Sequence, residues 1–168
     1  MQFTATIAEL KSAAADFLAA YWDRKRGTRR MPARADIDPT ELKPILPIII
    51  LSQIEPQPFR VFYRLVGTRA VENGRFDYTG HYLDRLNFPS EHGTDWPAIY
   101  RLIFRDRRPL HGFGAVKLQD GSVHRYASAI FPLSNTGEVV DHCIAIEDLD
   151  LNLLERDRLP QTSANPEE

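Results

Sequence analysis

The sequence predicts an α+β fold built on a five-stranded antiparallel sheet, and three observations support this class. Five segments of strand length carry alternating or continuous apolar residues. The last three of these segments are joined by short turns, as in consecutive hairpins. The helical patterns lie before the first strand and between the second and the third. Grouped strands with segregated helices are typical of an α+β domain rather than of alternating βαβ units.

The N-terminal region, residues 1–30, is expected to form an amphipathic helix. Thr6 followed by Glu9 is the pattern of a capping box, so the helix should begin at Ile7, and Gly27 should end it. Apolar residues then recur at steps of three and four and form one stripe: Ile7, Leu10, Ala14, Phe17 and Tyr21. The stripe can pack on its own domain or on a second copy of the chain. Together with the sheet it predicts a homodimer.

Residues 31–150 are expected to form the main domain. The run Asp38-Pro39-Thr40-Glu41 has the N-cap, proline and glutamate of a single helical turn, which Pro44 should end. The first strand is predicted at 46–54, where a continuous apolar run is typical of a central strand. The second strand, 59–66, alternates between apolar and polar residues, so one of its faces should be buried.

The pattern changes from strand to helix at Gly67. Thr68 can cap a short helical turn that ends at Gly74. The phrase Tyr63-Arg64-Leu65-Val66-Gly67-Thr68, followed by Asp77-Tyr78-Thr79-Gly80, resembles the second strand and following helical turns of a PAS domain, as found in a bacterial family of short stand-alone PAS proteins. The resemblance extends from Asp36 to Asp150. It implies the strand order 2-1-5-4-3, with helices over one face of the sheet.

The remaining elements follow the same order. Trp96, Ile99, Tyr100 and Ile103 lie at helical spacing and predict the longer internal helix, which Pro109 ends. The turn signal Asp120-Gly121 separates predicted strands at 110–118 and 123–133, and the turn at 135–137 leads to a strand at 139–149. Residues 151–168 are charged and then rich in polar residues, so we expect a disordered tail.

The turns also predict the register of the sheet. The first turn should pair Leu118 with Val123, and the second should pair Leu133 with Val139. One face then carries the large residues His111, Phe113, Tyr126, Ile130, His142, Ile144 and Ile146. The other carries Gly112, Gly114, Ala127, Ala129, Cys143 and Ala145, with Arg125 beside Glu147 near its edge. We expect the bulky face to line a cup and the small-residue face to receive the N-terminal helix, although a slip of one residue would exchange them.

The bulky face supplies the candidate ligand-binding residues. Tyrosines and apolar groups would form the walls, and arginine or histidine would orient a small organic ligand. The candidates are Tyr63, Arg64, Tyr100, Phe113, Tyr126, Ile144, His111 and His142. The same residues would equally suit a filled core, with each histidine satisfied by a backbone carbonyl. Asp141 and His142 are adjacent on a predicted strand, so they should face opposite sides and form no catalytic pair.

The resemblance allows cofactors to be tested residue by residue. Flavin-binding PAS domains that sense light carry a reactive cysteine on a helix, whereas the single cysteine here, Cys143, lies on a predicted strand. The segment Asn73-Gly74-Arg75-Phe76 has glycine where that thiol would be, so a covalent flavin is not expected. Haem-binding PAS domains take a histidine from the long internal helix, which has none here; His92 precedes it and gives only a weak indication. The cofactor stays open, and no metal site is expected.

Composition limits the remaining classes of function. The chain has 168 residues, 43% hydrophobic and 26% charged, with a net charge of -2. This balance gives no general attraction to nucleic acid or to anionic lipid. The basic residues 24–26 suit the negative end of a helix rather than a nucleic-acid site. One cysteine and the lack of a long apolar run favour a cytoplasmic protein outside the membrane.

Taken with these observations, the resemblance to a PAS domain implies a sensory or regulatory module that binds a small ligand, a protein partner, or both. It should have no catalytic output domain, and its effect would pass to an unknown signalling protein. The first alternative is a structural interaction domain with a filled core. The second is a small cone-shaped enzyme that uses His111 or His142 as a general base, for which the predicted inner face offers only Asp148 at its edge.

Overall fold

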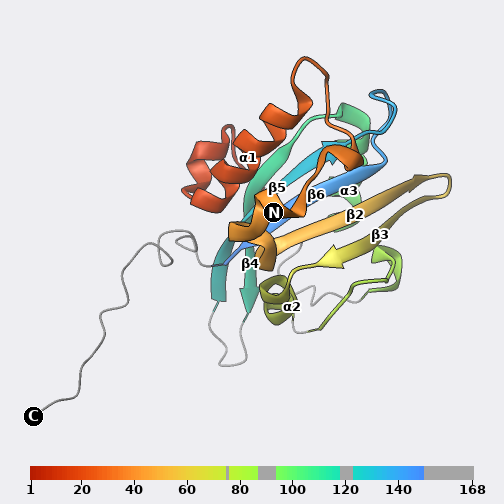
Figure 1. Cartoon of the computed structure of the whole chain (residues 1–168). Coiled ribbons are helices and arrows are strands. Elements are labelled where there is room, and N and C mark those ends of the chain that lie inside the picture. Colours follow the sequence, from red (N-terminus) through yellow and green to blue (C-terminus); the bar gives the residue numbers. More distant parts are fainter. Residues whose placement is uncertain (75, 87–93, 118–122, 150–168) are drawn as a thin grey trace, which may run out of the picture.

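The computed structural model describes residues 1–74, 76–86, 94–117 and 123–149. Its sheet has six strands, all paired antiparallel, in the order β1-β4-β5-β6-β2-β3 (Figure 1). The strands are β1 (Gln2–Phe3), β2 (Ile49–Pro56), β3 (Phe59–Val66), β4 (Leu110–Lys117), β5 (Val123–Leu133) and β6 (His142–Asp148). The helices are η1 (Ile7–Leu10), α1 (Ala13–Arg26), η2 (Arg34–Asp36), η3 (Pro39–Ile48), α2 (Thr68–Gly74), η4 (Leu83–Arg85) and α3 (Trp96–Asp106).

The predicted class and strand order are confirmed. Without β1, the sheet order is the 2-1-5-4-3 arrangement expected from the sequence. β1 is an addition that the sequence did not signal, because it has only two residues and gains its place by pairing with β4. The predicted turn at Asp120-Gly121 and the predicted disordered tail at 151–168 lie outside the described residues.

The N-terminal helix is interrupted, contrary to the single helix predicted from Ile7. Thr6 and Glu9 do form the expected contact, with the Thr6 backbone N–H donating to Glu9 Oε1 at 2.9 Å. This contact starts only the short η1, because Lys11 then adopts a left-handed conformation with φ 50°. Ser12 restarts the helix by accepting a hydrogen bond from the Ala15 N–H at 3.1 Å. The predicted stop at Gly27 is confirmed.

Helix α1 packs on the outer face of the sheet of its own chain (Figure 1). Trp22 Nε1 donates to the Pro132 carbonyl at 2.8 Å, and its ring lies 5.8 Å from that of Phe131. At the other end of the helix, Ser12 Oγ donates to Asp148 Oδ2 at 2.5 Å. The outer face is formed by Ala127, Ala129, Phe131, Leu133, Ile144 and Ile146, all buried. The predicted packing of the N-terminal helix on the outer face is thus observed within one chain, but the surface it contacts is not the predicted one. Of the small residues expected there, Ala127 and Ala129 lie under α1, whereas Cys143 and Ala145 lie on the opposite face.

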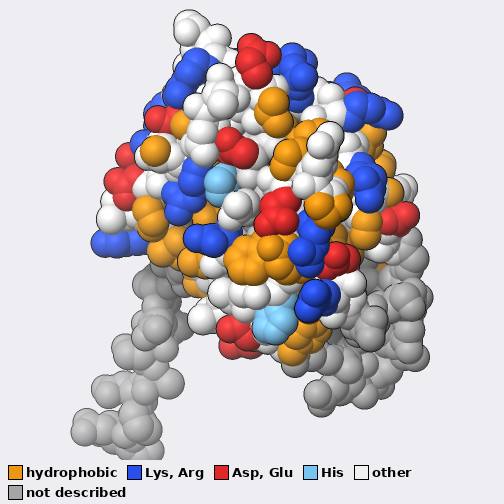
Figure 2. Space-filling model, turned by 90° about the vertical axis from the view of Figure 1, so that its right-hand side faces the viewer, with side chains coloured by type: hydrophobic (Ala, Val, Ile, Leu, Met, Phe, Trp, Pro, Cys, Tyr) orange, Lys and Arg blue, Asp and Glu red, His pale blue; other side chains and the backbone are white. Residues whose placement is uncertain are grey.

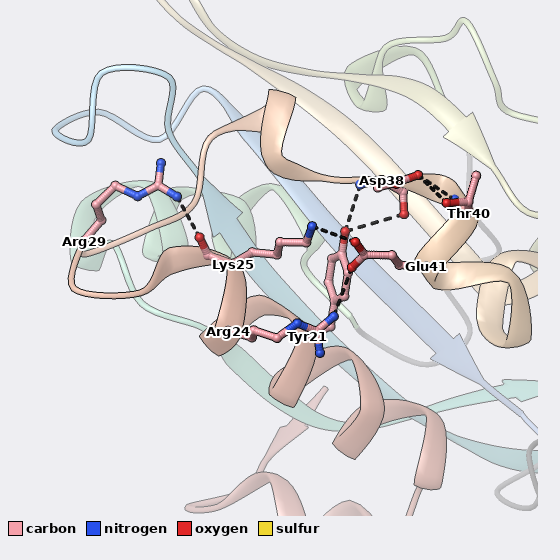
Figure 3. Close-up of polar contacts among 7 residues, drawn as sticks. All are labelled: Tyr21, Arg24, Lys25, Arg29, Asp38, Thr40 and Glu41. Atoms are coloured by element: carbon pink, nitrogen blue, oxygen red, sulfur yellow. Dashed lines mark hydrogen bonds and ion pairs between the residues drawn. The ribbon is translucent and has the colours of Figure 1, made fainter.

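The C-terminal end of α1 holds the connection to the sheet (Figure 3). The Tyr21 hydroxyl accepts a hydrogen bond from the Asp38 backbone N–H at 2.8 Å. Arg24 and Lys25 each contact Glu41 at 3.0 Å, and both lie over the Tyr21 ring. This part of the basic cluster thus serves contacts within the chain.

The connection itself differs from the prediction. Asp38 caps it as expected, but η3 runs for 10 residues through Pro44 and Pro47 instead of ending at Pro44. Both prolines lack the N–H that a strand ladder requires. The first central strand consequently begins at Ile49 rather than at residue 46.

Gly67 and Gly80 fix the corners after β3 for two different reasons. A Cβ at Gly67 would collide with the Pro47 carbonyl, so only glycine allows η3 to pass this close. Gly80 has φ +80°, a conformation that side chains disfavour. Between these corners, α2 begins at Thr68 as predicted.

The predicted register of both hairpins is wrong. Val123 pairs with Lys117 instead of Leu118, a slip of one residue. Leu133 pairs with His142 instead of Val139, because β6 begins three residues later than predicted. Both shifts are by an odd number of residues, and side chains alternate along a strand. The side chains of β4 and β6 therefore lie on the opposite faces from those predicted, relative to β5.

The exchange defines a second surface, which we call the cup face, on the side of the sheet that α3 covers. Its polar and small residues are Ser52, Tyr63, Tyr126, Ser128, Cys143, Ala145 and Glu147, and the same pairings place the buried apolar residues Ile50, Ile54, Val61 and Ile130 on this face. Cys143 and Ala145, which the sequence placed under the N-terminal helix, face the cup. Ile144, which the sequence placed in the cup, lies on the outer face.

The packing of Trp22 can be tested by substitution. We expect Trp22→Ala to lower the free energy of unfolding by about 3 to 5 kcal/mol, because it removes a buried ring and its hydrogen bond. Phe17→Ala on the same helix is the matched control and should cost less, because Phe17 is only half-buried. Urea denaturation of the three proteins measures both effects. Equal losses for the two variants would contradict the docking described here.

Candidate ligand-binding cup

Three tyrosines from separate segments meet over the cup face. Tyr63 comes from β3, Tyr78 from the segment after α2, and Tyr100 from α3, and all three are buried. The Tyr63 ring lies 4.8 Å from the Tyr78 ring at 78°, and 6.5 Å from the Tyr100 ring at 75°. These are edge-to-face contacts, the arrangement that aromatic quadrupoles favour. The cluster fixes β3, α3 and the intervening segment relative to one another.

A β-bulge directs Tyr63 into the cup. Leu51 pairs with Leu65, but the next residue, Ser52, pairs with Tyr63. Arg64 is the extra residue, and a bulge of this kind re-aims the side chains that follow it. Tyr63 therefore lies on the same side as Ser52, whereas Arg64 is exposed and its guanidinium carbon lies 5.6 Å from the centre of the Phe62 ring.

The buried hydroxyls are linked to each other. Tyr100 forms hydrogen bonds with Ser52 and Tyr63 that oppose the upward shift of its pKa. Burial is the larger effect and raises the pKa of Tyr100, as it does for Tyr63, Tyr78 and Tyr126. All four tyrosines therefore stay neutral at physiological pH and keep a proton to donate.

Glu147 and Ser128 face this cluster from the sheet. They are paired residues on β6 and β5, so their side chains lie on the same face. Ser128 is 1% exposed, and its Oγ has no hydrogen-bond partner among the described residues. Glu147 is partly buried, and burial alone raises its pKa to about 7. Among the described residues it has neither an ion pair nor a hydrogen bond to its carboxylate.

The predicted site residues divide into two groups. Tyr63, Tyr100 and Tyr126 lie on the cup side, and the Tyr126 ring lies against Gly114 on β4. The other five lie elsewhere, because of the register shifts and the bulge: Arg64, Phe113, Ile144, His111 and His142. Whether any of them binds a ligand stays a prediction, but their assembly into one lining is wrong.

The two histidines serve local contacts instead. His111 Nδ1 lies 2.7 Å from Thr4 Oγ1, and burial lowers the pKa of its ring. His142 Nδ1 lies 2.7 Å from Asp141 Oδ1, a pair that the sequence analysis excluded. Asp141 precedes β6, so strand alternation does not apply to it. Its other oxygen accepts from the Asn135 N–H at 2.8 Å, which makes the pair part of the turn.

Sequence reasoning missed the central acidic residue. It placed Glu147 beside Arg125 on the small-residue face, with Asp148 at the edge of the cup. In the structure Arg125 lies on the outer side, with its guanidinium carbon 4.4 Å from the centre of the Phe113 ring, and Asp148 contacts Ser12. The available signal was the adjacent pair Glu147-Asp148, since one of two consecutive strand residues must face inward.

Two other features bear on the chemistry. Cys143 is fully buried on the cup face, and burial raises the pKa of its thiol, so it is a poor nucleophile. In the described part of the chain, no group of three or more His, Cys, Asp or Glu side chains is arranged to hold a metal ion. Within the same residues, no helix has the length and hydrophobicity needed to span a bilayer.

Beside the cup, the surface around β3 carries aromatic and charged side chains in close contact. Figure 2 shows this side of the molecule, where hydrophobic, basic and acidic groups are interleaved. The Arg60 guanidinium carbon lies 3.4 Å from the centre of the Tyr82 ring, and Arg60 Nε forms an ion pair with Asp84 at 3.0 Å. The Arg101 guanidinium carbon lies 4.5 Å from the centre of the Phe59 ring. These two arginines are thus engaged within the chain.

A family model described as a PAS domain matches residues 10–105, more than half of the chain. The chain belongs to the PAS domain family. The match includes α1, β2, β3 and all of α3 except its last residue, and therefore the tyrosines contributed by β3, α3 and the segment between them. No match to this chain was found among curated proteins.

Several solved structures are similar at low identity. A LOV protein of Rhodobacter sphaeroides is 11% identical, with a TM-score of 0.45, over 66% of this chain and 67% of that one. The light-state structure of the blue-light photoreceptor Aureochrome1 LOV is 10% identical, with a TM-score of 0.44, over 68% and 93%. An RNA-binding Light-Oxygen-Voltage receptor is 16% identical, with a TM-score of 0.47, over 76% of this chain and 39% of its own length.

The pKa of Glu147 predicts how stability depends on pH. In the folded PAS domain the pKa of Glu147 is about 7, whereas the ordinary value for a glutamate is 4.5. Between these values the folded state binds more protons than the unfolded state, so the free energy of unfolding falls as pH rises, by about 3 kcal/mol in total. In Glu147→Gln this contribution should be absent, which makes the variant more stable than the wild type above neutral pH.

Urea unfolding at a series of pH values measures this difference between the two proteins. Glu138→Gln is the matched control, because the Glu138 side chain is 82% exposed, and its curve should follow that of the wild type. Parallel curves for the wild type and Glu147→Gln would show that Glu147 is not the titrating group.

Proposed function

We propose that this PAS domain is a sensory or regulatory module that binds a small organic ligand in the cup between the sheet and α3. The observation that carries the proposal is the pairing of Glu147 with Ser128 beneath buried tyrosines. Both side chains are polar, and both face the cup. Ser128 is buried, and its Oγ has no hydrogen-bond partner among the described residues, whereas Glu147 is only partly buried. Buried polar groups in a folded protein normally have partners, so a missing partner favours a ligand.

Membership of the PAS family supports the sensory role, since PAS domains are typically sensory and not catalytic. The alternative of an enzyme with a histidine general base loses its support, because His111 and His142 contact Thr4 and Asp141 away from the cup. The signal would pass to a separate protein. A homodimer remains part of the proposal, but α1 already packs on its own sheet, so a second copy would have to bind another surface.

The alternative of a filled core makes a different prediction for one substitution. Ser128→Phe adds a large ring at the centre of the cup face. If the cup holds space for a ligand, the ligand-free variant should fold with a loss of stability below about 1 kcal/mol. A filled core would be overpacked, at a cost of about 1 to 3 kcal/mol or more.

The experiment is urea denaturation of the ligand-free proteins, combined with native mass spectrometry of the wild type as purified. We expect a bound small molecule on the wild type and on Ser128→Ala, the control that removes the hydroxyl without filling the cup. Ser128→Phe should carry none. A wild type without any bound molecule, together with a strongly destabilised Ser128→Phe, would favour the filled core instead.

A further inference from the structure

Glu147 has no ion pair with any described residue, unlike the acidic residues Asp84 and Glu41. Asp84 is paired with Arg60 and Glu41 with Arg24 and Lys25. No lysine, arginine or histidine contributes to the pKa of Glu147, which burial alone raises. An ionised carboxylate that is partly buried and has no partner is less favourable than one in water, and a bound cation would offset this cost.

The groups that face Glu147 are neutral and aromatic. Tyr126 lies on β5 on the same face as Glu147, and the ring cluster of Tyr63, Tyr78 and Tyr100 meets over that face. In agreement with this placement, the charge of Glu147 acts on the pKa of all four tyrosines. Aromatic ring faces attract cations, and several rings beside one carboxylate are the usual surroundings of a bound organic ammonium.

We propose that the cup binds a small organic cation, with an alkylammonium group among the tyrosine rings and Glu147 as its counter-ion. This inference rests on the proposed function and names the class of its ligand. An anionic ligand would meet the carboxylate without an opposing basic group. A neutral ligand would leave the charge of Glu147 uncompensated whenever the carboxyl is ionised.

The protonation of Glu147 links binding to pH. The cation binds the ionised carboxyl, so it must displace a proton wherever Glu147 is protonated in the free protein. Affinity should therefore rise about tenfold per pH unit below the pKa and level off above it. Because the four facing tyrosines stay neutral in this range, Glu147 is the described cup-facing group expected to produce the change.

The test uses two probes of nearly equal shape. Choline carries a trimethylammonium group, and 3,3-dimethylbutan-1-ol replaces it with a neutral tert-butyl group. We expect isothermal titration of the full chain at neutral pH to show choline binding at least about tenfold tighter than the alcohol, the difference that a desolvated ring-and-cation contact supplies. Glu147→Gln should remove this preference and also the dependence of choline affinity on pH.

Glu138→Gln is the control and should retain both properties, because the Glu138 side chain is exposed in the turn between β5 and β6 and contacts Arg107 rather than a cup residue. If the alcohol binds as tightly as choline, or Glu147→Gln keeps the preference, the cation inference is wrong, while the cup remains a ligand site. If neither probe binds at millimolar concentration, the cation inference is also wrong. The proposed function is then decided separately by native mass spectrometry and the Ser128→Phe variant.

Discussion

The alternation of side chains along β5 and β6 is the constraint on which both surfaces of this protein depend. Ser128 pairs with Glu147, and both face the cup, while Ala127 pairs with Asp148 on the outer side. Because the period of a strand is two residues, a slip of one would send Glu147 under α1 and Asp148 into the cup. The chemical character of each face is therefore set by pairing geometry more than by composition.

The docking of α1 favours the register in which Asp148 lies on the outer face and Glu147 lies on the cup face. Its N-cap residue Ser12 reaches Asp148, and Trp22 reaches the Pro132 carbonyl near the other end of the helix. With these contacts made, the outer face is covered by apolar residues of the same chain. The opposite face is then left to α3 and the tyrosines, so the position of α1 indirectly determines which groups surround the cup.

A partly buried carboxyl group without a counter-charge lowers the stability of the fold at neutral pH, because ionisation becomes unfavourable. Groups of this kind are found preferentially at functional sites, where a ligand or a reaction uses the perturbed proton affinity. In the proposed function, Glu147 is the group whose perturbed proton affinity the ligand uses. Its surroundings combine aromatic ring faces with buried hydroxyls, which suit recognition better than proton transfer to a histidine, since both predicted histidines lie elsewhere.

The sequence by itself determined the class of the fold, the order of the strands and most of the elements, because these follow from local periodicity, caps and turn residues. It also placed Tyr63, Tyr100 and Tyr126 near a cup. Tertiary structure decided what local patterns do not encode: the pairing of Lys117 with Val123 and of Leu133 with His142, and the bulge that turns Arg64 away. A single residue of register reverses every side chain on a strand, so Glu147 could be assigned to the cup only after the strands were paired.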